Sequence, residues 1–114
     1  MIAVIFEAQP QEGRADTYFA IAAKLRPMLE QIDGFISIER YESLTTSGKF
    51  LSLSFWRDEA AIAEWRRIQE HRNAQTAGRN TVFQDYRLRV AGVMRDYGLQ
   101  DRAAAPEDSR AVHG

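Results

Sequence analysis

The spacing of apolar residues divides the first half of the chain into a strand and a helix. From residue 2 to residue 8 apolar side chains fill nearly every position, which is typical of a strand covered on both faces. Between residues 14 and 32 apolar residues recur at helical spacing, and Gly34 follows as a stop signal. The pattern therefore predicts a strand followed by a long amphipathic helix.

Two further strands follow, and a polar segment separates them. Residues 35–41 and 50–56 alternate, and residues 43–49 between them are polar and include a glycine, so the pair is predicted to form a hairpin. One face of the later strand is aliphatic and aromatic, and we expect it to pack on helices: Leu51, Leu53 and Phe55. The other face mixes rings and hydroxyls, and we expect it to face a cavity or a partner: Phe50, Ser52, Ser54 and Trp56.

A second helix and a last strand complete the pattern. Asp58 is a suitable N-cap, and the helix after it has an apolar stripe of Ile62, Trp65 and Ile68. An irregular connector is expected from residue 81, and residues 86–94 alternate as a strand.

The resulting order, strand, helix, strand, strand, helix, strand, predicts an α+β fold of the ferredoxin-like βαββαβ type. Its sheet is antiparallel and four-stranded, with both helices on one face. The opposite face is then uncovered, and we expect Phe6 and Phe50 to lie on it. Because large exposed apolar patches are uncommon on monomers, we expect a homodimer that packs its sheets face to face.

The length of 114 residues fits one domain, which we place at residues 1–97. Residues 98–114 are small and polar and have the composition of a flexible tail. If this tail is ordered, we expect it to pack on its own domain or on a partner chain.

Composition excludes several classes of function. The chain has no cysteine, which excludes disulfides, thiolate catalysis and cysteine-bound metals. Its 15 basic and 16 acidic residues are interspersed, so no concentrated positive face for nucleic acid is expected. No apolar run is long enough to span a membrane, and the first ten residues lack the features of a signal peptide, so we expect a cytoplasmic protein.

The residues around the second helix are the main candidates for a site. His71 is the one histidine before the tail, and it suits an acid–base group or an axial haem ligand. The alternative is a partly exposed helix histidine held by its neighbours. Trp56 and Trp65 flank the strand-to-helix turn, where each is either core or a flat wall against an aromatic ligand.

Carboxylates on the strands offer a second candidate base. Glu7 and Glu39 lie on strands that we expect to be neighbours, and a carboxylate in a sheet pocket would have a raised pKa. The alternative is an exposed glutamate or one paired with an arginine, for which the candidates are Arg40, Arg87 and Arg89. The chain contains no nucleotide, flavin or metal motif, so no metal or other cofactor is expected on that ground.

Two stretches, FISIERYESLTTSGKFLSLSFWRDEAAIAEWRRIQEHRNAQTAGR and FQDYRLRVAGVMRDYG, carry a family likeness. The specific features are the Gly34-Phe35 start of a strand, the Phe55-Trp56 end of the next strand, and a tryptophan followed six residues later by histidine. Over residues 1–97 the chain resembles the antibiotic biosynthesis monooxygenase domain, a dimeric α+β barrel superfamily.

The resemblance implies a pocket between the sheet and the helices, in a family that includes two kinds of monooxygenase and many members with no assigned substrate. Cofactor-independent members oxidise polycyclic phenols to quinones; they have an asparagine where this chain has Ala61, and a tyrosine where it has His71. Haem-degrading members of the Isd type use an asparagine in the first strand, near Glu7 here, a helix tryptophan that Trp65 matches, and a histidine several residues beyond His71. Neither set is complete in this chain.

We therefore expect a small homodimeric monooxygenase that acts on an aromatic or polycyclic molecule without bound metal or flavin. In this hypothesis His71 or Glu7 removes a phenolic proton, Trp65 holds the ring, and Arg87 stabilises developing negative charge. Further pocket residues are expected from the strand ends: Trp56, Phe83 and Tyr86. Binding or degradation of haem, and a non-catalytic dimer that binds a small molecule, are the alternatives.

Overall fold

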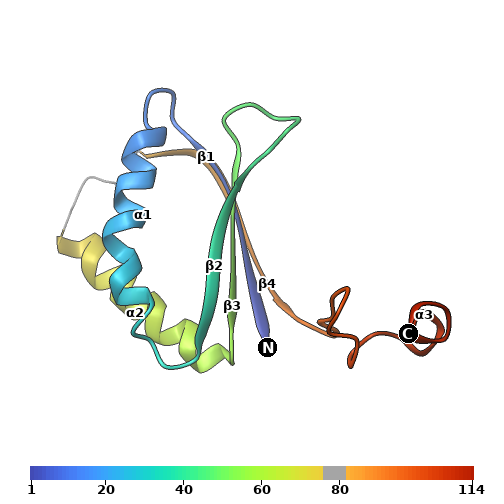
Figure 1. The fold of residues 1–114 in the computed structure, drawn as a ribbon. Helices are drawn as coiled ribbons and strands as arrows, with labels where there is room; N and C mark the ends of the chain where they lie inside the picture. The colour runs from blue at the N-terminus through green and yellow to red at the C-terminus, as the bar shows by residue number, and fades with distance from the viewer. Residues whose placement is uncertain (76–81) are drawn as a thin grey trace.

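The chain folds into one antiparallel sheet with two helices on a single face. The computed structural model describes the backbone of residues 1–75 and 82–114 and the side chains of residues 1–69 and 82–114. The elements, shown in Figure 1, are β1 (Ile2–Pro10), α1 (Ala15–Leu29), β2 (Phe35–Glu42), β3 (Phe50–Trp56), α2 (Glu59–Gln75), β4 (Phe83–Gly92) and α3 (Glu107–His113).

The strand order is β2-β3-β1-β4, and every neighbouring pair is antiparallel. The ferredoxin-like fold and the hairpin of β2 and β3 are therefore confirmed. The last strand differs in its bounds, because β4 already begins at Phe83, which pairs with Pro10 next to a register shift in β1. Residues 83–85, which were predicted as part of the connector, thus belong to the sheet.

Residues paired across neighbouring strands share a face, so the register divides the sheet into two surfaces. We call the side toward α1 and α2 the inner face; it comprises Ile2, Val4, Phe6, Ala8, Ile38, Arg40, Phe50, Ser52, Ser54, Trp56, Tyr86, Leu88 and Val90. The other side, the open face, comprises Ala3, Ile5, Glu7, Ser37, Glu39, Tyr41, Leu51, Leu53, Phe55, Arg87, Arg89 and Ala91. Figure 1 shows both long helices on the same side of the sheet.

This division reverses the expected orientation of β3. Trp56, Ser54 and Ser52 are buried on the inner face, whereas the leucines and Phe55 of this strand are half-buried on the open face. Phe6 and Phe50 also lie on the inner face, so their expected place on the uncovered side is wrong. A hydrogen bond of the indole helps to explain why this face of β3 is the buried one. Trp56 Nε1 donates to Ser54 Oγ at 2.9 Å, so the polar atom of this buried ring has a partner.

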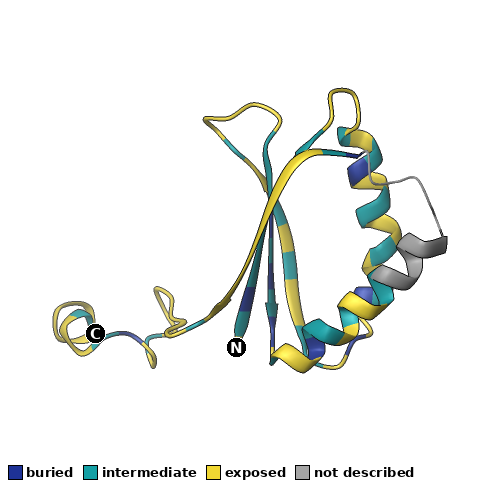
Figure 2. Ribbon diagram, turned by 180° about the vertical axis from the view of Figure 1, so that it is seen from behind, coloured by how far each residue is buried: buried dark blue, intermediate teal, exposed yellow. Residues whose placement is uncertain are grey.

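Two apolar clusters hold the helices to the inner face. The first joins Leu29, Ile32, Trp56 and Ala61, and the α2 stripe of Ile62, Trp65 and Ile68 packs against it as the sequence predicts. The second cluster lies near the other end of β1 and contains Ala8, Tyr18 and Val82, with Phe6, Ile21, Phe50 and Phe83 packed around them. Figure 2 shows the contrast with β4, which is exposed along nearly its whole length.

Two turns fix the path of the chain around the first cluster. Asp58 Oδ1 accepts a hydrogen bond from the Ala61 backbone N–H at 3.0 Å, which confirms the predicted cap of α2. This bond and the Arg57 guanidinium hold the pKa of Asp58 below its ordinary value. Gly34 has a φ of +97°, and its carbonyl accepts from the Arg57 N–H at 2.7 Å.

We expect Gly34→Ala to lower the free energy of unfolding by about 1–3 kcal/mol, because the left-handed backbone strains any side chain. The added Cβ would also lie 2.8 Å from the Ala61 Cβ, inside the packed cluster. Urea unfolding measures the change, and Gly92→Ala is the matched control because a Cβ there meets nothing within 4 Å. An equal, small effect of both substitutions would show that the turn tolerates a side chain.

The C-terminal residues leave the sheet and fold on themselves. Val93 N–H still donates to the Met1 carbonyl at 3.0 Å, but the segment then projects away from the helices and sheet, as Figure 1 shows. Arg102 donates to the carbonyls of Gly114 and Gly98 and to Ser109 Oγ, and α3 packs within this loop. The segment is therefore more ordered than its composition indicates, while a domain boundary at residues 97–98 stays a prediction. No helix within the described residues is long and apolar enough to cross a membrane.

Candidate functional site

The first cluster accounts for one of the two tryptophans. Trp56 is 2% exposed, and its ring packs edge-on against Phe35 with 5.3 Å between the ring centroids. Of the two alternatives for this residue, core or ligand wall, the structure therefore shows the core. Trp65 is half-buried and packs against this cluster from α2. Of the pair, Trp65 is the one that retains surface for a ligand.

Phe83 and Tyr86 belong to an aromatic group at the opposite end of the inner face. The Phe83 ring centroid lies 5.6 Å from that of Phe6 and 5.4 Å from that of Tyr18. Tyr86 contacts Phe6 at 5.6 Å and is 62% exposed. The pair of Ile2 with Trp56 lies about 20 Å along β1 from the pair of Ala8 with Tyr86, so Trp56 and Tyr86 lie at opposite ends of the inner face.

The open face carries Glu7 and Arg87, on the side of the sheet away from Trp65. Glu7 Oε2 lies 3.4 Å from Arg89 Nη1 and 3.6 Å from Lys49 Nζ. The hydrogen bond from Arg89 and the charge of Lys49 lower the pKa of Glu7, whereas a pocket base would need a raised pKa. Arg87 pairs with Glu7 in register and is exposed. The structure thus brings neither residue to the inner face.

The expectations for Glu39 and His71 have different outcomes. Glu39 and Glu7 are not on neighbouring strands, because β3 lies between β2 and β1. Glu39 accepts a hydrogen bond from the Tyr41 hydroxyl and lies in a different row from Glu7. The expected role of His71 cannot be placed, because its side chain lies outside the described residues.

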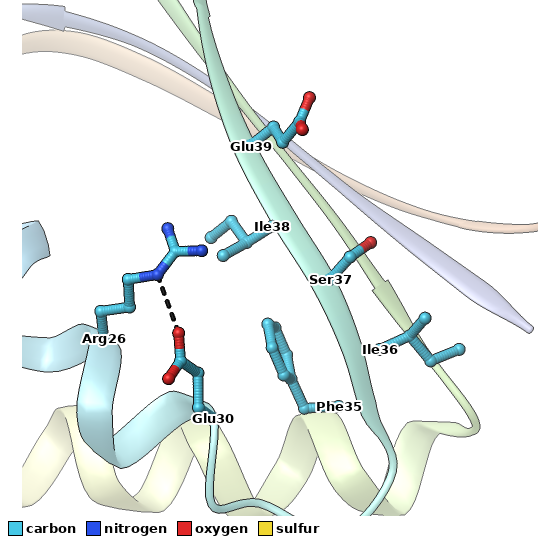
Figure 3. A pocket seen from close by; sticks show the side chains of 7 residues that line it. All are labelled: Arg26, Glu30, Phe35, Ile36, Ser37, Ile38 and Glu39. Carbon is cyan, nitrogen blue, oxygen red and sulfur yellow. Dashed lines mark hydrogen bonds and ion pairs between the residues drawn. The ribbon is translucent and has the colours of Figure 1, made fainter.

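A groove lies between the end of α1 and the edge strand β2, and residues from both faces of β2 line it. Its volume is about 480 Å³, and its lining is Arg26, Glu30, Phe35, Ile36, Ser37, Ile38 and Glu39. In Figure 3, Phe35 and Ile38 point from β2 toward α1, while Ser37 and Glu39 point to the other side of the sheet. On the helix wall Arg26 Nε donates to Glu30 Oε1 at 2.9 Å, so this cation already has a counter-ion.

Arg40 continues the inner face of β2 beyond this groove. It lies two positions after Ile38 and faces α1, where its Nε donates to the Tyr18 hydroxyl at 3.4 Å. Its guanidinium carbon is 5.9 Å from the centre of the Tyr18 ring. On α1, Tyr18 and Arg26 are two i,i+4 steps apart and share one side of the helix. We use the name α1–β2 cleft for this groove together with Arg40 and Tyr18, which lie next to it along β2 and α1 and are not part of its lining.

Sequence reasoning treated Arg40 only as a partner for a glutamate. The sequence contained a signal for the position of Arg40, because Arg40 lies two residues after Ile38 and therefore shares its face of β2. Using this signal requires the orientation of β3, because the buried face of β3 determines which alternating residues of β2 point toward α1. Within the described residues, no cluster of carboxylates and histidines could hold a metal ion.

Comparisons with known proteins agree with this fold and with its family likeness. Residues 1–77 match the family model described as antibiotic biosynthesis monooxygenase. A jasmonate monooxygenase from Pyricularia oryzae is 54% identical over 93 residues, which is 82% of this chain and 43% of that protein. The chain therefore spans less than half the length of this relative.

Two further proteins extend the comparison. The uncharacterised protein YqjZ from Bacillus subtilis is 31% identical over 100 residues, covering 87% of this chain and 84% of its own length. The structure of the haem degrader MhuD from Mycobacterium tuberculosis, which has two haems bound in its active site, has a TM-score of 0.67 at 15% identity and covers 86% of this chain and 100% of that one. Because the family model matches residues 1–77, more than half of the chain, this chain belongs to the antibiotic biosynthesis monooxygenase family.

Proposed function

We propose that the chain is a monooxygenase that oxidises a small molecule with an apolar ring. The observation that carries this proposal is the 54% identity to a jasmonate monooxygenase over 82% of the chain. Jasmonate is the first candidate substrate on that ground. Aromatic and polycyclic phenols are the second group, from the activities that occur in the family.

The space between α1, α2 and the inner face is the place we propose for the substrate. Phe35 and Ile38 give the α1–β2 cleft an apolar floor, and Trp65 offers a half-buried ring on α2. A volume of about 480 Å³ is in the range of small-molecule sites. We assign proton removal to His71, because Glu7 is ion-paired on the open face and its lowered pKa makes it a weaker base.

The electron balance separates the two substrate groups. A phenol that becomes a quinone gives up four electrons, which reduce O₂ to one substrate oxygen and one water, so no further donor is needed. A hydroxylation takes two electrons from the substrate, and a second reductant must supply the other two. We propose the first route, without metal or flavin, for phenols, and a reductant-dependent route for jasmonate.

We expect one labelled oxygen atom per product molecule when the protein is incubated with substrate under ¹⁸O₂. Anthrone and jasmonate are the two probes, each with and without ascorbate, and mass spectrometry reads the product. Anthrone should be converted without ascorbate, and jasmonate only with it. Absence of labelled product from both probes would contradict the proposed activity and favour a binding protein.

His71→Ala tests the assigned base in the same assay. Turnover should fall by about 100-fold or more, as loss of a general base does, while substrate binding should persist. The exposed Arg66→Gln in α2 is the control for an unrelated change on this helix. An unchanged rate in His71→Ala would remove the histidine from the mechanism.

Haem enters only as an alternative ligand. Its support is a likeness of fold at 15% identity, which says nothing about the residues of a haem site. Titration of the purified protein with haem tests it, since binding through His71 would shift the Soret band and the shift would disappear in His71→Ala.

We further propose a homodimer formed through the open face. The centre of this face is apolar, with Ile5, Leu51, Leu53 and Phe55 all half-buried in one chain. Charged groups surround that centre, among them the Glu7–Arg89 pair and Arg87. An apolar centre with a polar rim is the arrangement of a protein interface.

A further inference from the structure

We propose that Arg40 is an anion anchor, and that the α1–β2 cleft takes substrates that carry a carboxylate on an apolar body. This inference rests on the proposed function only in treating the cleft as the substrate site. It adds a substrate class and names the residue that selects it.

The first observation is that Arg40, a partly buried cation, has no counter-ion among the described residues. Arg26, Arg57 and Arg89 each form an ion pair with a carboxylate. Among the described residues, no carboxylate forms an ion pair with Arg40, although its side chain is half-buried between β2 and α1. Removing part of the water around a guanidinium is unfavourable without a compensating anion. A ligand carboxylate would supply that anion.

The second observation is the way Tyr18 holds the side chain. Tyr18 is 6% exposed, and its hydroxyl oxygen accepts a hydrogen bond from Arg40 Nε at 3.4 Å. No described residue accepts a hydrogen bond from the terminal nitrogens Nη1 and Nη2. Those two nitrogens form one end of the planar guanidinium, which can bind both oxygens of a carboxylate at once. Among the described residues, Tyr18 therefore leaves the bidentate end of the arginine available for a ligand.

The third observation is the apolar surface on both sides of the charge. Toward one end, Ile38 and Phe35 form the groove floor seen in Figure 3. Toward the other end, the Tyr18 and Phe19 rings pack with Phe50 at 6.5 and 4.9 Å between ring centroids. A molecule with a compact apolar body and one acidic group matches this arrangement. A neutral ring compound would fill the same floor and leave Arg40 without a partner.

A matched pair of ligands separates the charge from the apolar body. The probes are 2-naphthylacetate and its methyl ester, and binding is measured by naphthyl fluorescence and calorimetry without any turnover. Because a hydrogen bond to a charged group strengthens binding more than one to a neutral group, we expect the acid to bind roughly 10- to 100-fold more tightly than the ester.

Substitutions at the anchor assign that preference to one residue. Arg40→Gln should abolish the preference for the acid and leave binding of the ester unchanged, and Arg40→Lys should retain part of it. Tyr18→Phe keeps the ring and removes the oxygen that orients Nε, so it should reduce the preference without abolishing it. Arg66→Gln removes the same charge from an exposed position and should retain the full preference.

The inference is overturned if the acid and ester bind equally, if the preference survives Arg40→Gln, or if the acid does not bind at millimolar concentration. Circular dichroism of each variant verifies that the fold is intact, and Arg40→Lys keeps the test decisive if the glutamine variant unfolds. The result is independent of oxygenation. If the protein prefers the acid but forms no labelled product, the anion anchor stands and the proposed activity is rejected. If it forms labelled product but binds acid and ester equally, the activity stands and the anchor is rejected.

Discussion

Replacing Trp56 with alanine should lower the free energy of unfolding by about 3–5 kcal/mol, the usual cost of removing a large buried aromatic side chain. Trp56 is 2% exposed and is the centre of the cluster that joins the end of α1, the start of α2 and the inner face. Its loss leaves a cavity between helices and sheet, and it also leaves Ser54 Oγ without the indole N–H that it accepts at 2.9 Å. Both effects act in the same direction.

Urea unfolding at fixed protein concentration measures this change. Trp56→Phe separates the two contributions, because it keeps most of the ring and removes the N–H, so its cost should be smaller. Leu44→Ala is the matched control for deleting an apolar side chain, since Leu44 lies in the β2–β3 loop and is fully exposed; its effect should stay within about 0.5 kcal/mol. A loss below about 1 kcal/mol in Trp56→Ala would mean that the helices are not held to the sheet through this ring.

The order and kind of the elements followed from periodicity and capping. Alternation in β2 and β3 with a polar glycine-containing loop between them gave the hairpin, and Asp58 marked the start of α2 through a bond that the structure contains. These features depend on neighbours in the chain. Local physical chemistry is therefore sufficient to predict them.

The faces of the strands depend on contacts between distant segments, and there the prediction was wrong for β3. A period of two residues separates Leu51, Leu53 and Phe55 from the serines and Trp56, but it does not say which set meets the helices. The choice depends on whether Trp56 can fill the space beside Leu29 and Ile32, which is visible only once the helices are in place.

The same reversal explains why the predicted site divides into separate parts. Glu7 and Arg87 follow the strand alternation to the open face, where the glutamate finds Arg89 and Lys49. Ala61, at the position where some family members have an asparagine, is 4% exposed in the core against Gly34. A chain without that asparagine can pack α2 closely on the turn at Gly34. The cation of the cleft, Arg40, was identified only through its contact with Tyr18.

The open face gives the second large expected effect, since Leu53→Lys should convert the proposed dimer into a monomer. Leu53 lies at the centre of this face, between Ile5 on β1 and Glu39 on β2. In a single chain the lysine can pair with Glu39 across the strands, so the fold should be retained. In a two-fold dimer the substitution places a desolvated cation from each copy in the same apolar centre, and like charges brought together in an interface cost several kcal/mol.

We therefore expect the dissociation constant to rise by more than about a thousandfold, since each factor of ten corresponds to about 1.4 kcal/mol. Sedimentation equilibrium of the full chain measures it. Leu44→Lys adds the same charge to the exposed loop and should leave the dimer intact. A monomeric unsubstituted protein, or a dimer that Leu53→Lys does not weaken, would reject the open face as the interface. Either result would require water to cover the half-buried Ile5, Leu51, Leu53 and Phe55, which is an unfavourable arrangement for a contiguous apolar surface.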